Sequence, residues 1–267
     1  MSIMRIVALT LGMLCGWLWP VPQPLEAQQV RRTLMAVFAH PDDERIVGPL
    51  LARYARAGHA VYLVIATDGG KGVREHAGIP AGDSLAHARA QEARCAAEEL
   101  GIQAPLLLGL EDAGLASFAN LGRLRDELRR VFRELRPELV ISFGPEGGTG
   151  HPDHRLVGAV VTEVVQGGEA GMPQSLYYAS LPAERMPDAP AARPEVTAVP
   201  QQHLPVAVPF APADFTAAER AFACHQTQYT GAEMAAIMRY LAHGFDGAVH
   251  LRPWYGTAER RTDLFER

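Results

Sequence analysis

The sequence predicts an α/β fold in which a mostly parallel sheet is covered by helices on both faces. Strand-length apolar runs and helical patterns alternate along the chain after Val30. The apolar runs are nearly continuous, which is typical of parallel strands that are buried on both sides. Sheets of this kind bind ligands outside the carboxyl ends of their strands.

Each expected strand is a short apolar run that stops at a loop or helix-start signal. The runs are residues 33–39 (TLMAVFA), 60–66 (AVYLVIA), 105–110 (PLLLGL), 139–143 (LVISF) and 175–179 (SLYYA). Helices are expected where apolar residues recur at helical spacing. They cover residues 46–57, 84–100, 121–135, 152–165 and 216–243. Residues 182–205 are rich in Pro and Ala, and we expect an irregular excursion there within a single domain of residues 28–267.

Composition restricts the class of protein. With 48% hydrophobic and 21% charged residues the chain has the composition of an ordinary globular protein. Lys and Arg number 25 against 30 Asp and Glu, which gives a formal net charge of -5. Nucleic acid is therefore not an expected partner, because phosphate binding needs concentrated positive charge.

Residues 1–27 are expected to be a signal peptide. Arg5 precedes an apolar stretch over residues 6–19, which has the length of a signal-peptide core and is short for a membrane span. Prolines follow, and Ala27 offers a small residue before a cleavage site. We expect export to the periplasm or the extracellular space, with no membrane span in the mature chain; an uncleaved N-terminal anchor is the alternative.

Two cysteines, Cys95 and Cys224, remain after this leader. In an exported protein they could form a disulfide, whereas their apolar surroundings on expected helices equally suit buried free thiols. Sequence alone leaves the two alternatives open.

The segment VFAHPDDERIV (37–47) places polar residues directly after the first expected strand. His40 and Asp43 are three positions apart, so in the first turn of a helix they could share one ion while Asp42 projects elsewhere. Acidic residues and Pro also suit a helix start for capping and dipole reasons alone. This segment by itself therefore fits both a helix cap and a metal site.

A second segment of the same kind follows the fourth expected strand. A glycine-rich loop (143–150) leads to His151-Pro152-Asp153-His154, where His-Pro-Asp again opens a helix. The loop lacks the Gly-Lys-Ser/Thr of a phosphate-binding loop. Two such segments at the carboxyl ends of parallel strands can converge, and two His with one Asp leave an open position for water, as in catalytic zinc sites.

These motifs resemble those of the GlcNAc-phosphatidylinositol de-N-acetylase family, also called PIG-L or LmbE-like. The segments that carry the resemblance are AHPDDE (39–44), GHPDH (150–154), ARAQEARCAAEELGI (88–102) and ACHQTQ (223–228). Together they extend over nearly the whole mature chain. The resemblance implies a Rossmann-like three-layer α/β/α fold with a mostly parallel sheet.

The resemblance also implies a ligand set and a base. Zinc, or another divalent metal, would be bound by His40, Asp43 and His154, and Asp42 would be the general base. A metal lowers the pKa of bound water, and a nearby carboxylate can then take its proton.

His151, paired with Asp153, would be the acid or the oxyanion-stabilising group. Hydroxide would attack the acetamide carbonyl, and a charged His151 together with the metal would stabilise the tetrahedral oxyanion. Asp153 would keep His151 oriented and cationic. Some family members carry Tyr two residues before this His; Thr149 stands there in this chain, so an oxyanion contact from a phenol is not carried over.

Further residues have alternatives that the sequence leaves open. Arg89 binds a substrate hydroxyl, braces the acids or lies on a solvated helix face. Gln228 and His225 line the site or make structural contacts, with Gln228 taken as substrate-binding. Glu44 supports the helix start or acts directly, and Asp68 is expected to have a turn role.

The expected function is removal of the N-acetyl group from an N-acetylated amino sugar, or from its glycan or glycolipid conjugate. One alternative is a non-catalytic carbohydrate- or glycolipid-binding protein on the same fold. Another is a metal hydrolase of a different linear amide or an ester. Nothing in the sequence indicates an oligomeric state.

Overall fold

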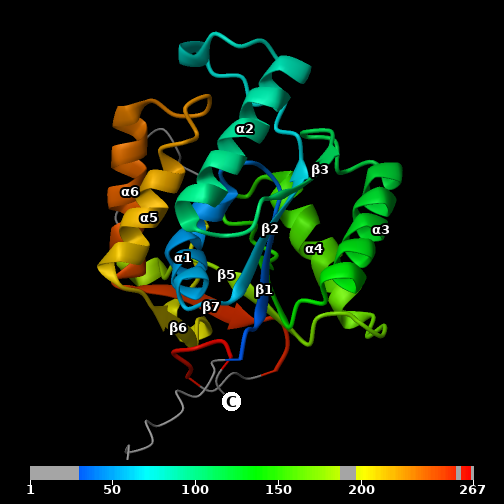
Figure 1. The fold of residues 1–267 in the computed structure, drawn as a ribbon, viewed down its shortest axis with the longest axis vertical. Helices are drawn as coiled ribbons and strands as arrows, with labels where there is room; N and C mark the ends of the chain where they lie inside the picture. Colours follow the sequence, from blue (N-terminus) through cyan, green and yellow to red (C-terminus); the bar gives the residue numbers. More distant parts are fainter. Residues whose placement is uncertain (1–29, 187–196, 257–259, 266–267) are drawn as a thin grey trace, which may run out of the picture. The chain divides into compact units, whose positions relative to one another are not determined.

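In the computed structural model, which describes residues 30–186, 197–256 and 260–265, a seven-stranded sheet forms the centre (Figure 1). The strands are β1 (Thr33–Phe38), β2 (Ala60–Thr67), β3 (Leu106–Leu110), β4 (Leu139–Phe143), β5 (Ser175–Ala179), β6 (Val206–Pro209) and β7 (Ala248–Pro253). Their order across the sheet is β3-β2-β1-β4-β5-β7-β6, and the pairs among β1 to β5 are all parallel. The expected α/β class with a mostly parallel sheet is confirmed.

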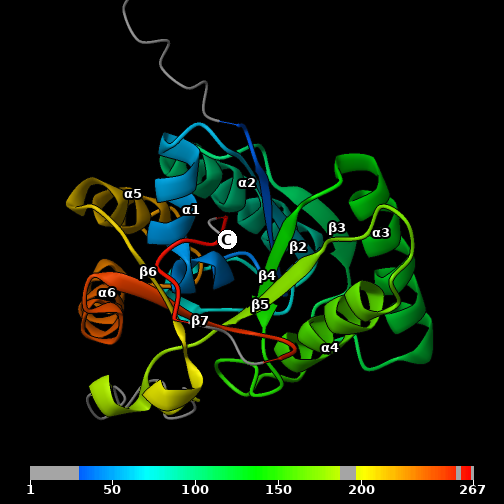
Figure 2. The same ribbon diagram turned by 90° about the horizontal axis from the view of Figure 1, so that it is seen from below.

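Helices cover both faces of the sheet (Figure 2). They are α1 (Gly48–Arg56), α2 (Asp83–Leu100), α3 (Phe118–Leu135), α4 (Pro152–Gln166), α5 (Pro212–Phe222) and α6 (Gly231–Phe245). Short 3-10 helices are η1 (Asp43–Ile46), η2 (Glu75–Ala77), η3 (Ala183–Arg185) and η4 (Gln201–His203). One hydrophobic core joins the sheet to α1, α2, α5 and α6, and a second joins it to α3 and α4.

Strand β1 shows how the sheet serves both cores. Leu34, Ala36 and Phe38 belong to the first core, while Met35 and Val37 belong to the second. Successive side chains of a strand point to opposite faces, so a continuous apolar run is what two covered faces require. The three-layer α/β/α arrangement is thereby confirmed.

The C-terminal third differs from the expected elements. The single helix expected over residues 216–243 is two helices, α5 and α6, separated by the loop 223–230. Helix α6 has its own start, because the Thr230 side chain accepts a hydrogen bond from the Glu233 N–H while the Glu233 carboxylate accepts from the Thr230 N–H. The last two strands, β7 and the edge strand β6, were not expected; β7 pairs antiparallel with both β5 and β6.

The strand order changes direction between β1 and β4. From β1 the chain first builds β2 and β3 on one side, then returns to place β4 and β5 on the other. Loops that leave the carboxyl ends of β1 and β4 therefore diverge to opposite faces and open a crevice at this switch point. The two His-Pro-Asp segments follow these two strands.

The described residues from Arg31 onward form one compact unit. The expected signal peptide, residues 1–27, lies outside the described residues. Within the described ranges, no helix combines the length and the apolar character needed to cross a bilayer.

We expect Gly158→Ala to reduce the free energy of unfolding by about 1–3 kcal/mol, because overpacking forces backbone to move. A Cβ at Gly158 in α4 would lie 2.3 Å from the carbonyl oxygen of Phe143 in β4. The control is Gly231→Ala in α6, where a Cβ meets nothing within 4 Å. Urea denaturation measures both, and equal stability of the two variants would contradict the close contact between α4 and β4.

Candidate active site

The segment after β1 turns sharply and separates the roles of its two aspartates. Asp43 Oδ2 accepts the backbone N–H groups of Ala39 at 3.2 Å and His40 at 2.8 Å. Asp42 has a positive φ of 108°, an uncommon backbone conformation for a residue other than glycine. As expected, Asp42 and Asp43 project toward different partners: Asp43 toward two histidines, and Asp42 toward arginines and a tyrosine.

Helix α4 supplies the histidines of the second segment. His154 lies in its first turn, where the Nδ1 atom is 2.9 Å from the carbonyl oxygen of Gly147 and the ring stacks on Phe143. A carbonyl oxygen only accepts hydrogen bonds, so we assign the proton to Nδ1. This leaves the Nε2 lone pair of His154 directed at His40 and Asp43.

Donor atoms of three residues meet at the switch point of the sheet. His154 Nε2 lies 3.1 Å from His40 Nδ1 and 3.2 Å from Asp43 Oδ1, and His40 Nδ1 lies 3.6 Å from Asp43 Oδ2. Ligands of a tetrahedral zinc ion with bonds of about 2.1 Å are separated by about 3.4 Å. The distances and the chemistry of this donor set therefore fit a divalent metal.

The opposite ring nitrogen of His40 faces acids. Nε2 lies 3.1 Å from Asp112 Oδ1 and 3.5 Å from Asp153 Oδ2. A carboxylate behind a ligating histidine fixes its tautomer and orientation. Burial lowers the pKa of His40, but the three neighbouring carboxylates raise it by more than burial lowers it. The pKa therefore lies well above the ordinary value. The surroundings thus favour positive charge at this point.

Asp112 is a site residue that the sequence analysis missed. It follows β3, its Oδ2 accepts the Lys71 N–H at 3.0 Å, and its pKa is lowered to about 2 because hydrogen bonding to His40 outweighs burial. The available signal was its position after a strand, the same that marked His40. Asp68 has the expected turn role, since its Oδ1 accepts the N–H groups of Gly70 and Asp112.

His40 also belongs to two other groups of potential ligands. It lies within reach of His151 with His154, and of Asp112 with Asp153. The described residues thus offer more donors than one tetrahedral ion needs, all centred on His40.

The expected pairing of His151 with the Asp153 carboxylate does not hold in this structure. Asp153 Oδ2 accepts the Ala113 N–H at 2.8 Å and faces His40, because the first turn of α4 directs this side chain toward the loop after β3. It is the backbone N–H of Asp153 that donates to His151 Nδ1, at 3.1 Å. Burial, together with nearby His40 and His154, lowers the pKa of His151, so the neutral imidazole is favoured over the expected cation.

Asp42 is held as a buried carboxylate. Tyr229 donates to its Oδ2 at 2.5 Å, Arg45 Nη1 lies 3.4 Å from Oδ2, and Arg89 Nη2 lies 3.4 Å from Oδ1. Burial alone would raise the pKa of Asp42, but the two guanidinium groups outweigh it and the pKa is lowered. Tyr229 was also missed by the sequence analysis, since a tyrosine in a loop carries no distinguishing pattern.

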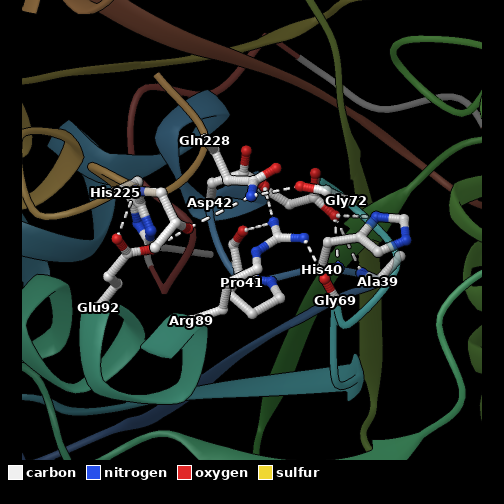
Figure 3. A network of polar contacts seen from close by, with 12 residues as sticks. Ala39, His40, Pro41, Asp42, Gly69, Gly72, Arg89, Glu92, His225 and Gln228 are labelled. Atoms are coloured by element: carbon white, nitrogen blue, oxygen red, sulfur yellow. Dashed lines mark hydrogen bonds and ion pairs between the residues drawn. The ribbon is translucent and has the colours of Figure 1, made fainter. Parts of the chain in front are cut away.

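Arg89 braces the loops rather than lying on a solvated helix face. Its side chain is buried, with 3% of the residue exposed. Nη1 donates to the carbonyl oxygen of Gly69 at 3.0 Å and Nη2 to that of Pro41 at 2.5 Å. Figure 3 shows the guanidinium between these two loops and close to Asp42.

Glu44 and His225 form a buried pair behind Asp42. Glu44 Oε1 lies 2.6 Å from His225 Nε2, while Oε2 accepts the Asp42 N–H at 3.1 Å. Burial lowers the pKa of His225, but Glu44 raises it by more than burial lowers it, and the charged imidazole is therefore favoured. Of the alternatives for Glu44, the structure therefore shows the supporting one, and His225 makes a structural contact.

The loop 223–230 is attached to α2 at several points. Glu92 accepts from the N–H and hydroxyl of Thr227, and a Cys95–Cys224 disulfide with a Cα–Cα distance of 6.0 Å joins the two segments. Of the two alternatives for the cysteines, the structure shows the disulfide. Helix α2 and this loop therefore bring their side chains to the site as one unit.

Around these side chains lies a cavity of about 160 Å³, which we call the polar cavity. Its lining residues are His40, Asp42, Asp43, Arg45, Gly72, Arg89, Asp112, Thr149, His151, His154, Gln228 and Tyr229. Gln228 Nε2 donates to the Gly72 carbonyl oxygen at 2.8 Å. Thr149 Oγ1 lies 3.1 Å from His154 Nδ1. All the expected site residues except Asp153 line this cavity, and Asp153 lies directly behind His40.

The fold and the donor set define an α/β protein with a site suited to a divalent metal at the switch point of its sheet. A family model described as GlcNAc-PI de-N-acetylase (PIG-L) matches residues 35–165. A 1D-myo-inositol 2-acetamido-2-deoxy-alpha-D-glucopyranoside deacetylase of Mycobacterium sp. (strain KMS) is 31% identical in an alignment of 216 positions that covers 73% of this chain and 68% of that protein. The chain belongs to the GlcNAc-PI de-N-acetylase (PIG-L) family, as the motifs predicted.

A second relative, from Catenulispora acidiphila, is named deacetylase 2 for the same compound. It is 38% identical over 173 residues, and the match spans 57% of each chain. Two solved structures share the fold. The N,N'-diacetylchitobiose deacetylase from Pyrococcus horikoshii matches with a TM-score of 0.64 and 18% identity, covering 82% of both chains. A 4-carboxy-2-hydroxymuconate hydratase from Pseudomonas putida matches with a TM-score of 0.60 and 18% identity over 85% of this chain and 98% of that one.

We expect His225→Leu to destabilise the protein by about 3–5 kcal/mol, because it leaves Glu44 buried without its partner. The double variant Glu44→Gln/His225→Leu also removes the unpaired carboxylate of Glu44, so it is expected to recover at least about 1 kcal/mol of this loss. Urea denaturation of wild type, both single variants and the double variant completes the cycle. His243→Leu, at an exposed position of α6, is the control. Additive losses would show that Glu44 and His225 are not coupled.

Replacing both cysteines by alanine is expected to lower the free energy of unfolding by about 2–4 kcal/mol, since the disulfide closes a long loop in the unfolded chain. The two residues are separated by 129 positions. Denaturation of wild type and the Cys95→Ala/Cys224→Ala variant, each with and without reductant, measures this effect. Reductant should destabilise only the wild type; an equal response of both proteins would contradict the disulfide.

Proposed function

We propose that this protein is a zinc-dependent de-N-acetylase of an N-acetylated amino sugar or its conjugate. The observation that carries the proposal is the convergence of three metal donors, a charged carboxylate and an imidazole on one cavity. Membership in the de-N-acetylase family and the names of the two relatives support it.

His40, Asp43 and His154 would hold the metal. A zinc ion there would polarise the amide carbonyl and lower the pKa of a water molecule. The carboxylates of Asp112 and Asp153 behind His40 would keep its Nδ1 lone pair directed at the ion.

Asp42 is the base in this proposal. Arg45 and Arg89 hold its carboxylate in the charged form, which can accept a proton from the attacking water. The same proton can then pass to the leaving nitrogen, so that the amine departs uncharged together with acetic acid, which releases its remaining proton to the solvent to give acetate. Tyr229 fixes the orientation of the carboxylate through its hydroxyl.

His151 stabilises the oxyanion as a neutral group. Because Nδ1 accepts the Asp153 N–H, the ring proton is on Nε2, which can donate to the developing negative charge. This differs from the cationic role implied by the family resemblance, and it follows from the position of His151 as the N-cap of α4.

The polar cavity also supports a sugar as substrate. Arg89, Gln228 and Arg45 bring amide and guanidinium groups to its wall, and these can serve hydroxyl groups. We propose that residues 1–27 direct export, and that the substrate is an extracytoplasmic glycan, glycolipid or scavenged sugar. The proposed export can be tested by locating a C-terminally tagged full-length chain in fractionated cells.

The test compares wild type with Asp42→Asn and His154→Ala on N-acetylglucosamine conjugates, following release of acetate and free amine. Asp42→Asn is expected to retain stoichiometric zinc and to lose about 10²–10⁴-fold in kcat, since general base catalysis typically contributes that much. His154→Ala is expected to lose zinc, measured by metal analysis, and activity with it. His243→Ala, at an exposed position, is the control.

Activity that survives both substitutions unchanged would contradict the assignment. Sugar binding without acetate release, in a protein that takes up no metal, would identify a non-catalytic carbohydrate-binding protein instead.

A further inference from the structure

A second cavity, of about 70 Å³, adjoins the polar cavity and has a different character. The two share Asp43, Arg45, Thr149 and His154 in their linings. We call the second one the apolar pocket. Its apolar wall is formed by Ile46, Phe143, Leu181, Ile237 and Leu241, and Gly148 and Tyr240 complete the lining that it does not share with the polar cavity. It therefore begins at the metal donors and leads away from them between apolar side chains.

The apolar wall is built from separate parts of the chain. Phe143 ends β4 and stacks on the ring of His154, with ring centroids 4.3 Å apart. Ile237 and Leu241 are four residues apart in α6 and so lie on one face of that helix. Arg89 and Tyr229, which contact Asp42 in the polar cavity, do not line this pocket.

The two cavities differ in what they can bind. A sugar placed against the apolar wall would lose the hydrogen bonds that its hydroxyls make with water, which is costly. A hydrocarbon chain loses nothing there and gains from leaving water. The polar cavity thus suits the sugar, and the apolar pocket suits an aliphatic group.

The geometry of an amide connects the two cavities. An amide is planar and trans, so the acyl chain and the substituent on nitrogen leave the scissile bond in opposite directions. With the carbonyl at His40, Asp43 and His154 and the sugar in the polar cavity, the acyl chain leads into the apolar pocket. We propose that the apolar pocket is an acyl-binding subsite, and that the protein accepts N-acyl amino sugars with straight chains longer than acetyl. This rests on the proposed function.

The experiment measures kcat/KM for N-acetyl-, N-butyryl- and N-hexanoylglucosamine. Burial of each methylene group is worth about fourfold in kcat/KM, so the butyryl compound, with two more methylene groups, should exceed the acetyl compound by roughly fifteenfold. Ile237→Trp should fill the pocket, so that the ratio of the butyryl to the acetyl kcat/KM falls to about one. Ala235→Trp places the same indole at an exposed position of α6 and should preserve the gain.

A binding measurement separates this proposal from the proposed function. Calorimetry on the Asp42→Asn protein gives Kd for the same three compounds without turnover. Tighter binding with chain length that Ile237→Trp abolishes supports the subsite, even if no compound is hydrolysed and the deacetylase function fails. Hydrolysis with kcat/KM and Kd independent of chain length, or falling from acetyl to butyryl, overturns the subsite while the deacetylase function stands.

Discussion

The site depends on the parallel pairing of β1 with β4. Adjacent strands lie about 4.8 Å apart, and this spacing brings the loops that follow them into contact. The register that sets Ala36 opposite Ile141 lets His40 and His154 approach to 3.1 Å although they are 114 residues apart in sequence. Because this is also where the strand order reverses, the helices after the two strands cover opposite faces and leave the crevice open. The loops after β2 and β3 then supply Asp112 and the backbone that Arg89 braces.

Burying so many charges costs desolvation free energy, and the structure offsets this by pairing the charges with one another. An isolated buried carboxylate would be neutralised, yet Asp42, Asp43 and Asp112 all have lowered pKa values because cationic or hydrogen-bonding partners surround them. Glu44 is matched by His225 in the same way. His40 Nδ1 and an oxygen of Asp43 both lie close to His154 Nε2, at 3.1 and 3.2 Å. In the proposed function a divalent cation would occupy the space between these donors.

The sequence predicted the parts of the molecule that carry a periodic or positional signal. The five parallel strands are continuous apolar runs, and the ligand motifs stand directly after two of them. After β1 the short helix has no side-chain cap, whereas after β4 His151 caps α4 and the proposed ligand His154 stands in the first turn of that helix. Contacts between distant segments had no such signal. Asp112 stands after a strand, as His40 does, but only the folded structure shows that it faces His40, and Tyr229 reaches Asp42 only through the folding of the loop 223–230. Strand β6 has four residues, and His250 and Arg252 interrupt the apolar residues of β7, so neither is a continuous apolar run. The sequence predicts that the Asp153 carboxylate pairs with its neighbour His151, whereas in the folded chain this carboxylate accepts a hydrogen bond from Ala113 in the loop after β3.

Thr149 connects the departure from the family motif to the shape of the site. It lines both the polar cavity and the apolar pocket, and its hydroxyl contacts the Nδ1 side of His154. A phenol at this position would place a ring at the junction of the two cavities, where it could reach an oxyanion but would occupy the path of an acyl chain. In the proposed function, a threonine would leave that path open, and oxyanion stabilisation would fall to His151 together with the metal. Because Thr149 lines both cavities, the size of its side chain bears on the oxyanion contact and on the proposed acyl subsite at the same time.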